Sequence, residues 1–157
     1  MAHFSQSARH LEDLATEAAV ARASSLMEAM VAAYALMAHA DGEVSGSERR
    51  RIFSILRDNP VMTVFSRAEL AEEIATHEAN FRYDPELAQQ IAREKLAPIA
   101  GDRRAAHKVV QACRELIPAD GIAHPAEYRA LAGIKVVLDF DDRPASAASD
   151  DRSRALS

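Results

Sequence analysis

The sequence predicts an all-α protein of about seven helices arranged in two related halves. Apolar residues recur at steps of three and four from end to end, and no segment shows the alternation that is typical of a strand. The tripeptide Ala-Asp-Gly occurs twice, at 40–42 and 119–121, and in both copies a Glu follows after five further residues. Each copy separates two apolar helical stretches, which predicts a helix–Asp-Gly loop–helix unit that is used twice.

The first two helices are expected over residues 7–22 and 25–40. The first is polar, with Leu11, Leu14 and Ala18 on one face. The second has a wide apolar stripe and is expected to be central, together with the helix that ends near residue 119, because a wide stripe requires neighbours on several sides. That stripe consists of Met27, Met30, Val31, Tyr34 and Met37. Gly42 ends the second helix, as glycine commonly does.

Five more helices follow, each with a local start signal. Ser45 precedes the third, which Asn59-Pro60 ends. Ser66 and Glu69 form a capping-box pattern at the start of the fourth, and Asp84-Pro85 opens the fifth, which runs to about Ala97. The last two are expected over 102–117 and 125–138. We assign residues 1–140 to a single domain and the polar segment 141–157 to a disordered tail.

Composition limits the classes of function. The net charge of −5 provides no general attraction to nucleic acid. The single cysteine, Cys113, excludes an intramolecular disulfide and fits a small core position. The N-terminal residues lack the pattern of a secretory signal, and the longest apolar stretch, 29–40, is too short to span a bilayer. We therefore expect a cytoplasmic protein with no direct membrane insertion.

The two loops have a structural interpretation. Glycine just after an apolar helix provides the positive φ that ends it. Ser45 and Glu48 form a capping-box pattern, in which the hydroxyl and the carboxylate each accept a free backbone N–H. In the second loop His124 replaces the serine, but Pro125 and Glu127 keep their places. Capping alone accounts for both glutamates.

The loops also have a cation-binding interpretation. Asp, Gly and Glu stand at the spacing of positions five, six and twelve of an EF-hand calcium loop. Positions one and three would be Met37 and His39 in the first loop and Leu116 and Pro118 in the second, so half of the oxygen ligands are missing. Hard oxygen ligands favour Ca²⁺ or Mg²⁺, and so few of them predict weak binding. The candidate ligands are Asp41, Glu43, Glu48, Asp120 and Glu127.

From about Met27 to Phe140 the sequence resembles the TerB family of tellurite resistance proteins. The resemblance lies in an ordered set of segments rather than in one motif: 38–49 and 119–127 with their Asp-Gly loops, the middle region from 59–65 through 81–84, and the apolar helix to Leu138. It implies an all-α fold of two related halves. It also implies a non-enzymatic role in bacterial resistance to tellurite and related chemical or phage stress.

The resemblance further implies partners and a ligand. The family is linked to a membrane-embedded protein, TerC, and to soluble calcium-binding proteins of the same system. Its acidic clusters near the Asp-Gly loops are proposed to bind divalent cations, which here corresponds to Asp41, Glu48, Asp120 and Glu127. This chain departs from the family in its second loop, where residues 122–126 contain no carboxylate.

Two other functions are consistent with the residues. A metal held by the loop carboxylates could activate water, as in a metal-dependent hydrolase, but no nucleophile, base and orienting group stand together. Alternatively, the helix at 7–22 could attach a scaffold to a membrane-embedded partner. A zinc site that combines His39 or His124 with carboxylates is a further alternative.

Overall fold

The fold is entirely helical in the computed structural model, which describes residues 2–42, 44–117 and 124–143. Within these ranges there are six α-helices and two short 3₁₀ helices, with no strand, which confirms the predicted all-α class. In chain order the elements are α1 (Ala2–Ala38), α2 (Gly46–Asp58), η1 (Pro60–Val64), α3 (Arg67–Tyr83), α4 (Pro85–Leu96), η2 (Ala97–Ile99), α5 (Arg103–Leu116) and α6 (Pro125–Val137).

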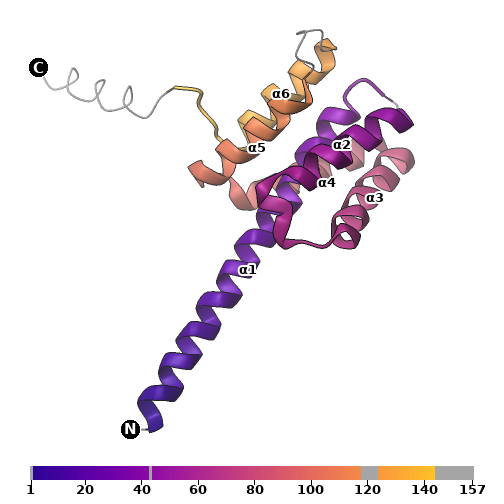
Figure 1. Cartoon of the computed structure of the whole chain (residues 1–157). Coiled ribbons are helices and arrows are strands. Elements are labelled where there is room, and N and C mark those ends of the chain that lie inside the picture. The colour runs from indigo at the N-terminus through magenta and orange to yellow at the C-terminus, as the bar shows by residue number, and fades with distance from the viewer. Residues whose placement is uncertain (1, 43, 118–123, 144–157) are drawn as a thin grey trace, which may run out of the picture.

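The first two predicted helices are a single one. The prediction of separate helices over 7–22 and 25–40 is wrong, because α1 continues without a break through Ser24 and Ser25 for 37 residues. Serine has only a moderate helix propensity, but neither Gly nor Pro interrupts this stretch, so the backbone hydrogen bonds continue. The N-terminal half of α1 projects from the rest of the protein (Figure 1), and Leu11 is 66% exposed there.

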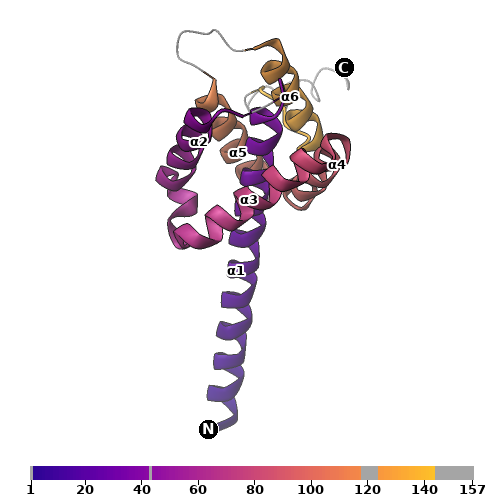
Figure 2. The ribbon, with the colours of Figure 1, turned by 90° about the vertical axis from the view of Figure 1, so that its right-hand side faces the viewer.

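The C-terminal half of α1 is the centre of the fold. From Met27 to Ala38 every residue except Glu28 and Leu36 is buried. Ala29, Ala32 and Ala33 have no exposed surface, and such small side chains allow neighbouring helices to approach closely. This segment packs against α3, α4, α5 and α6 (Figure 2), which confirms that it is central.

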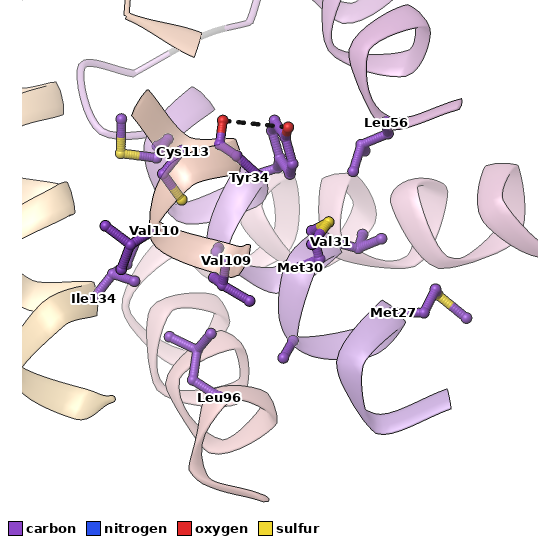
Figure 3. Packing of buried hydrophobic residues seen from close by; sticks show 14 of the residues in the cluster. Met27, Met30, Val31, Tyr34, Leu56, Leu96, Val109, Val110, Cys113 and Ile134 are labelled. Atoms are coloured by element: carbon purple, nitrogen blue, oxygen red, sulfur yellow. Dashed lines mark hydrogen bonds between the residues drawn. The ribbon is translucent and has the colours of Figure 1, made fainter. Parts of the chain in front are cut away.

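The main core surrounds Tyr34, which is 1% exposed (Figure 3). Its hydroxyl donates a hydrogen bond to the Ala112 carbonyl on α5 at 3.4 Å, so its polar atom is satisfied inside the core. Burial also raises the pKa of the Cys113 thiol to about 12, so this cysteine is protonated and unreactive, as a core residue. The fully buried neighbours from other elements are Leu56, Leu96, Val109, Val110 and Ile134.

The predicted helix starts are mostly confirmed. At α3, Ser66 and Glu69 make both bonds of the capping box. At α4, the Asp84 carboxylate accepts two backbone N–H groups ahead of Pro85. The two 3₁₀ helices were not predicted. Asn59-Pro60 and Ala97-Pro98 indicate that the preceding helix ends, but this pattern is the same for an irregular turn and for a 3₁₀ helix.

The start of the predicted tail is attached to the domain. The Asp142 carboxylate forms ion pairs with Arg114 of α5 and with Lys135 of α6, the latter at 2.8 Å. These two cations hold the pKa of Asp142 below its usual value. The remaining residues, 144–157, lie outside the described ranges, so the disordered tail stays a prediction.

One helix passes a length and hydropathy test for a membrane span, namely residues 6–38 of α1. The most apolar window of this helix is 56% buried inside the protein. The buried portion is the central helix of the core. Because a buried core helix has the same length and hydropathy as a membrane span, this result is weak evidence for one.

His77 is the only buried polar or charged side chain among the described residues. It is 2% exposed, and neither ring nitrogen has a hydrogen-bond partner. Its Nε2 lies 3.7 Å from a carboxylate oxygen of Glu73, which is itself paired with Lys95. Burial lowers the pKa of His77, and the attraction of Glu73 opposes this only in part.

We predict that His77 makes the protein less stable in mild acid. Since the pKa is lower in the folded state, the unfolded chain binds the proton first as the pH falls below about 6.5. The free energy of unfolding should therefore be constant near neutral pH and decrease as the pH falls through and below this value. Denaturant titrations from pH 5 to 8 measure it.

His77→Leu should reduce this pH dependence, whereas His10→Leu, on an exposed part of α1, should retain it. Equal slopes for the wild type and His77→Leu would refute the assignment to His77.

Candidate metal centre at the Asp-Gly loops

The first Asp-Gly loop is a tight turn at the end of the central helix. The backbone N–H of Gly42 donates to the His39 carbonyl at 3.3 Å, and Gly42 has φ of 123°, which a residue with a side chain rarely adopts. Asp41 is exposed at the tip. Gly42 thus turns the chain from α1 toward α2 and leaves the Asp41 carboxylate in solvent.

Ser45 caps the following helix. Its hydroxyl accepts the backbone N–H of Glu48 at 3.2 Å. The second bond of a capping box, in which the Glu48 carboxylate would accept the backbone N–H of Ser45, is absent at α2. Among the described helices only α3 has both bonds. The predicted box at Ser45 is therefore half formed, and the Glu48 carboxylate is not used in capping.

The second loop enters α6 through His124. Its Nδ1 accepts the backbone N–H of Ala126 at 3.1 Å, with Pro125 at the first helical position. Because Nδ1 accepts this bond, the proton of the neutral ring lies on Nε2, so neither nitrogen has a free lone pair while the cap is formed, which argues against the zinc alternative at His124. The preceding residues, 118–123, lie outside the described ranges, and Asp120 is among them.

Carboxylates from the two loops face the same pocket. Glu48 of α2 and Glu127 of α6 line a pocket of about 340 Å³. Burial raises the pKa of Glu127, and the negative charges of Asp41 and Glu48 raise it further. Three of the five predicted ligands, from segments about 80 residues apart, therefore lie within electrostatic range of one another. We refer to Asp41, Glu48 and Glu127 as the carboxylate face.

The floor of this pocket explains why the site is poor in ligands. Met37 and Leu116 line it, and these are the residues at position one of each EF-hand-like loop. An EF-hand places a carboxylate there, whereas here both positions are apolar. Arg51 also lines the pocket and supplies a positive charge beside the carboxylates.

The described residues do not form a complete metal site. No group of three His, Cys, Asp or Glu side chains within them has a geometry that holds a metal ion. The other two predicted ligands, Glu43 and Asp120, lie outside the described ranges. What the structure shows is a partly buried carboxylate pair in a pocket with a third acidic residue nearby.

His39 lies in a second pocket rather than with the carboxylates. Its ring stacks on Phe81 with centroids 4.3 Å apart, and burial lowers its pKa. Beside it, Arg49 and Glu78 form an ion pair at 2.6 Å between α2 and α3. Neither contact follows from a local sequence pattern, because Phe81 is about 40 residues from His39 and Glu78 is 29 residues from Arg49.

We predict that Glu127→Gln stabilises the protein at neutral pH. A raised pKa means that the folded state holds the proton more tightly than the unfolded state does, so the contribution of Glu127 to stability is full in acid and is lost as the pH rises through its folded pKa. Glutamine keeps the oxygen acceptor without the charge. The gain should be modest, on the order of 0.5 kcal/mol, because the group is partly hydrated.

Thermal unfolding at pH 7 and at pH 4 measures this effect. The variant should melt above the wild type at pH 7 and level with it at pH 4, while Glu72→Gln, on the exposed face of α3, should change neither temperature. A lower melting temperature for Glu127→Gln at pH 7 would show that the carboxylate stabilises the fold.

Comparisons with known proteins give one match. The family model of tellurite resistance protein TerB matches residues 27–150, which is most of the chain. No curated protein and no solved structure matches. The match begins where α1 enters the core at Met27 and spans both Asp-Gly loops. This chain is therefore a member of the TerB family of tellurite resistance proteins.

Proposed function

We propose that this TerB-family protein is a non-catalytic interaction module whose carboxylate face binds Ca²⁺ or Mg²⁺ weakly. The observation that carries the proposal is the pocket shared by Glu48 and Glu127, where burial and the charges of Asp41 and Glu48 raise the pKa of Glu127. Carboxylates that repel one another across a pocket are stabilised when a cation lies between them. Glu43 and Asp120, from the same two loops, are the further ligands in this proposal.

The physical role of the cation would be to join the two loops. Glu48 lies at the start of α2 and Glu127 at the start of α6, so a shared cation would connect two helices that the loops otherwise hold separately. A bound cation would also reduce the negative charge of the surface that a partner meets. Binding of a partner would in this way depend on the cation.

The partner in this proposal is a protein of a tellurite-resistance system. Family membership supports a role in resistance and in related stress, and the family's link to TerC favours a membrane-embedded partner. The protein would then be cytoplasmic and reach the inner membrane through that partner. The projecting half of α1 carries several charged residues, which favours attachment through a protein over insertion into lipid.

We predict weak binding of divalent cations that depends on both loops. Calorimetric titration of the wild type with Ca²⁺ and with Mg²⁺ should give a dissociation constant on the order of 10⁻⁴ M, because few carboxylates and two apolar floor positions replace a full oxygen cage. Asp41→Asn and Glu127→Gln should each weaken binding several-fold. Glu72→Gln is the matched control and should bind as the wild type does.

Micromolar binding, or weak binding that Asp41→Asn and Glu127→Gln leave unchanged, would rule out the carboxylate face as the site. Metal-dependent hydrolysis of a phosphoester or peptide that is lost in Asp41→Ala would instead support an enzyme.

We also predict that deletion of the gene makes its host more sensitive to tellurite. Growth on graded tellurite measures this, and wild-type protein supplied on a plasmid should restore resistance. If resistance requires the cation, Glu127→Gln should restore it only in part, while Glu72→Gln restores it fully. Unchanged sensitivity after deletion would contradict the tellurite role in this host.

A further inference from the structure

The N-terminal half of α1 has no packing partner within the described residues. We call residues 6–25 the arm. Its large apolar side chains are exposed: Leu11 at 66%, Leu14 at 47% and Val20 at 59%. Figures 1 and 2 both show it extending away from the other helices. The arm also precedes the part of the chain that the TerB family model matches, which begins at residue 27.

The arm carries the spacing of a coiled-coil seam. Leu11, Leu14, Ala18 and Ala21 follow one another at steps of three, four and three, so they lie along one face of the helix. Most of its charged side chains lie elsewhere on the helix, and Glu12 and Asp13 point away from this face. An isolated helix of about 20 residues is only marginally stable in water, so a continuous arm would gain from a partner along this face.

We propose that the arms of two copies of this chain pair as an antiparallel two-helix coil. In the register that we propose, Leu11 lies opposite the partner subunit's Leu14, and the reverse pair follows by two-fold symmetry. This register pairs residues 6–19 of one arm with residues 19–6 of the other. It also buries all four leucines in the middle of the interface, where their exclusion from water is greatest.

Charge complementarity supports this register. It brings His10 of each chain beside the partner subunit's Glu17, so that one such pair flanks the leucines on each side. In each pair an imidazole N–H can donate to a carboxylate. The acidic residues Glu12 and Asp13 lie on the outer face and do not meet their symmetry copies. Shifting the register by one heptad would instead place the two Glu17 side chains beside each other.

The surroundings of α1 favour the antiparallel direction. From Met27 onward the helix is covered by other helices on nearly every side. A parallel pair, with axes about 8–10 Å apart, would bring two such domains to the same end, where they would collide. An antiparallel pair places the two domains at opposite ends of the coil.

The composition of the arm distinguishes a second copy from a lipid surface. Arg9, Glu12, Asp13, Glu17 and Arg22 all lie within the arm. A helix with these charges and few large apolar residues is too polar to insert into a bilayer. The acidic residues would also be repelled by an anionic membrane surface.

Sedimentation equilibrium of the full chain, over roughly a hundredfold range of concentration, tests the pairing. The wild type should pass from monomer to dimer. The double variant Leu11→Glu/Leu14→Glu should stay monomeric, with its association weakened at least tenfold and the melting of the domain unchanged. Val20→Glu is the matched control, because Val20 is equally exposed on the other side of the helix, and it should dimerise as the wild type does.

Cysteine cross-linking tests the direction of the helices. In our register Ala18 lies opposite the partner subunit's Ser7, so a mixture of Ser7→Cys and Ala18→Cys chains should form a disulfide heterodimer on oxidation. Ala18→Cys alone should not, since an antiparallel pair holds the two copies of residue 18 far apart. Cys113 is fully buried and does not interfere.

Three outcomes would overturn the proposal: a wild type that remains monomeric throughout, cross-linking of Ala18→Cys with itself, or equal dimerisation of the double-glutamate variant. Co-sedimentation of a monomeric wild type with anionic phosphatidylserine vesicles, lost in Leu11→Glu/Leu14→Glu, would assign the arm to lipid instead. The test does not depend on the cation site, because the titrations of the carboxylate face use other residues.

Discussion

The burial of the second half of α1 is the constraint on which the rest of the structure depends. A helix that is apolar on nearly every side must be surrounded by other helices, and α3, α4, α5 and α6 all pack against it. Alanines with no exposed surface let these neighbours come close, while Tyr34 and the methionines fill the wider spaces. The positions of both Asp-Gly loops follow from this arrangement. The first loop ends the central helix directly, and the second follows α5, which lies along that helix.

At that end of the domain the same segments supply helix caps and the carboxylates of the proposed cation site. Ser45 and His124 cap their helices, and the caps leave Glu48 and Glu127 directed toward a common pocket. Burial and, after it, the negative charges of Asp41 and Glu48 raise the pKa of Glu127, which destabilises the folded state at neutral pH. The backbone N–H and the side chain of His124 oppose this effect only in part. In the proposed function, a bound cation would relieve this small unfavourable interaction.

Within one continuous helix the environment changes from solvent to core. From residue 6 to residue 22 the side chains of the helix are exposed, and beyond Met27 it is the most buried element of the domain. The TerB family match begins at this boundary, so the family domain starts where α1 becomes buried, although no break in the backbone separates it from the arm. Surfaces for a cation-dependent partner and for a second copy would thus lie at opposite ends of α1.

Local patterns in the sequence were enough to predict the all-α class, the central helix, the buried Cys113 and most helix starts, because periodicity and capping act over a few residues. The same patterns placed a break near residues 22–25, where side-chain polarity changes but the backbone has no reason to stop. The approach of Glu127 to Asp41 and Glu48 depended on tertiary structure, since it requires α5 and α6 to pack against α1. The unpaired nitrogens of His77 and the stacking of His39 on Phe81 likewise arise between distant segments. Electrostatic and desolvation effects depend on distance in space, and in this protein only the packing around α1 determines those distances.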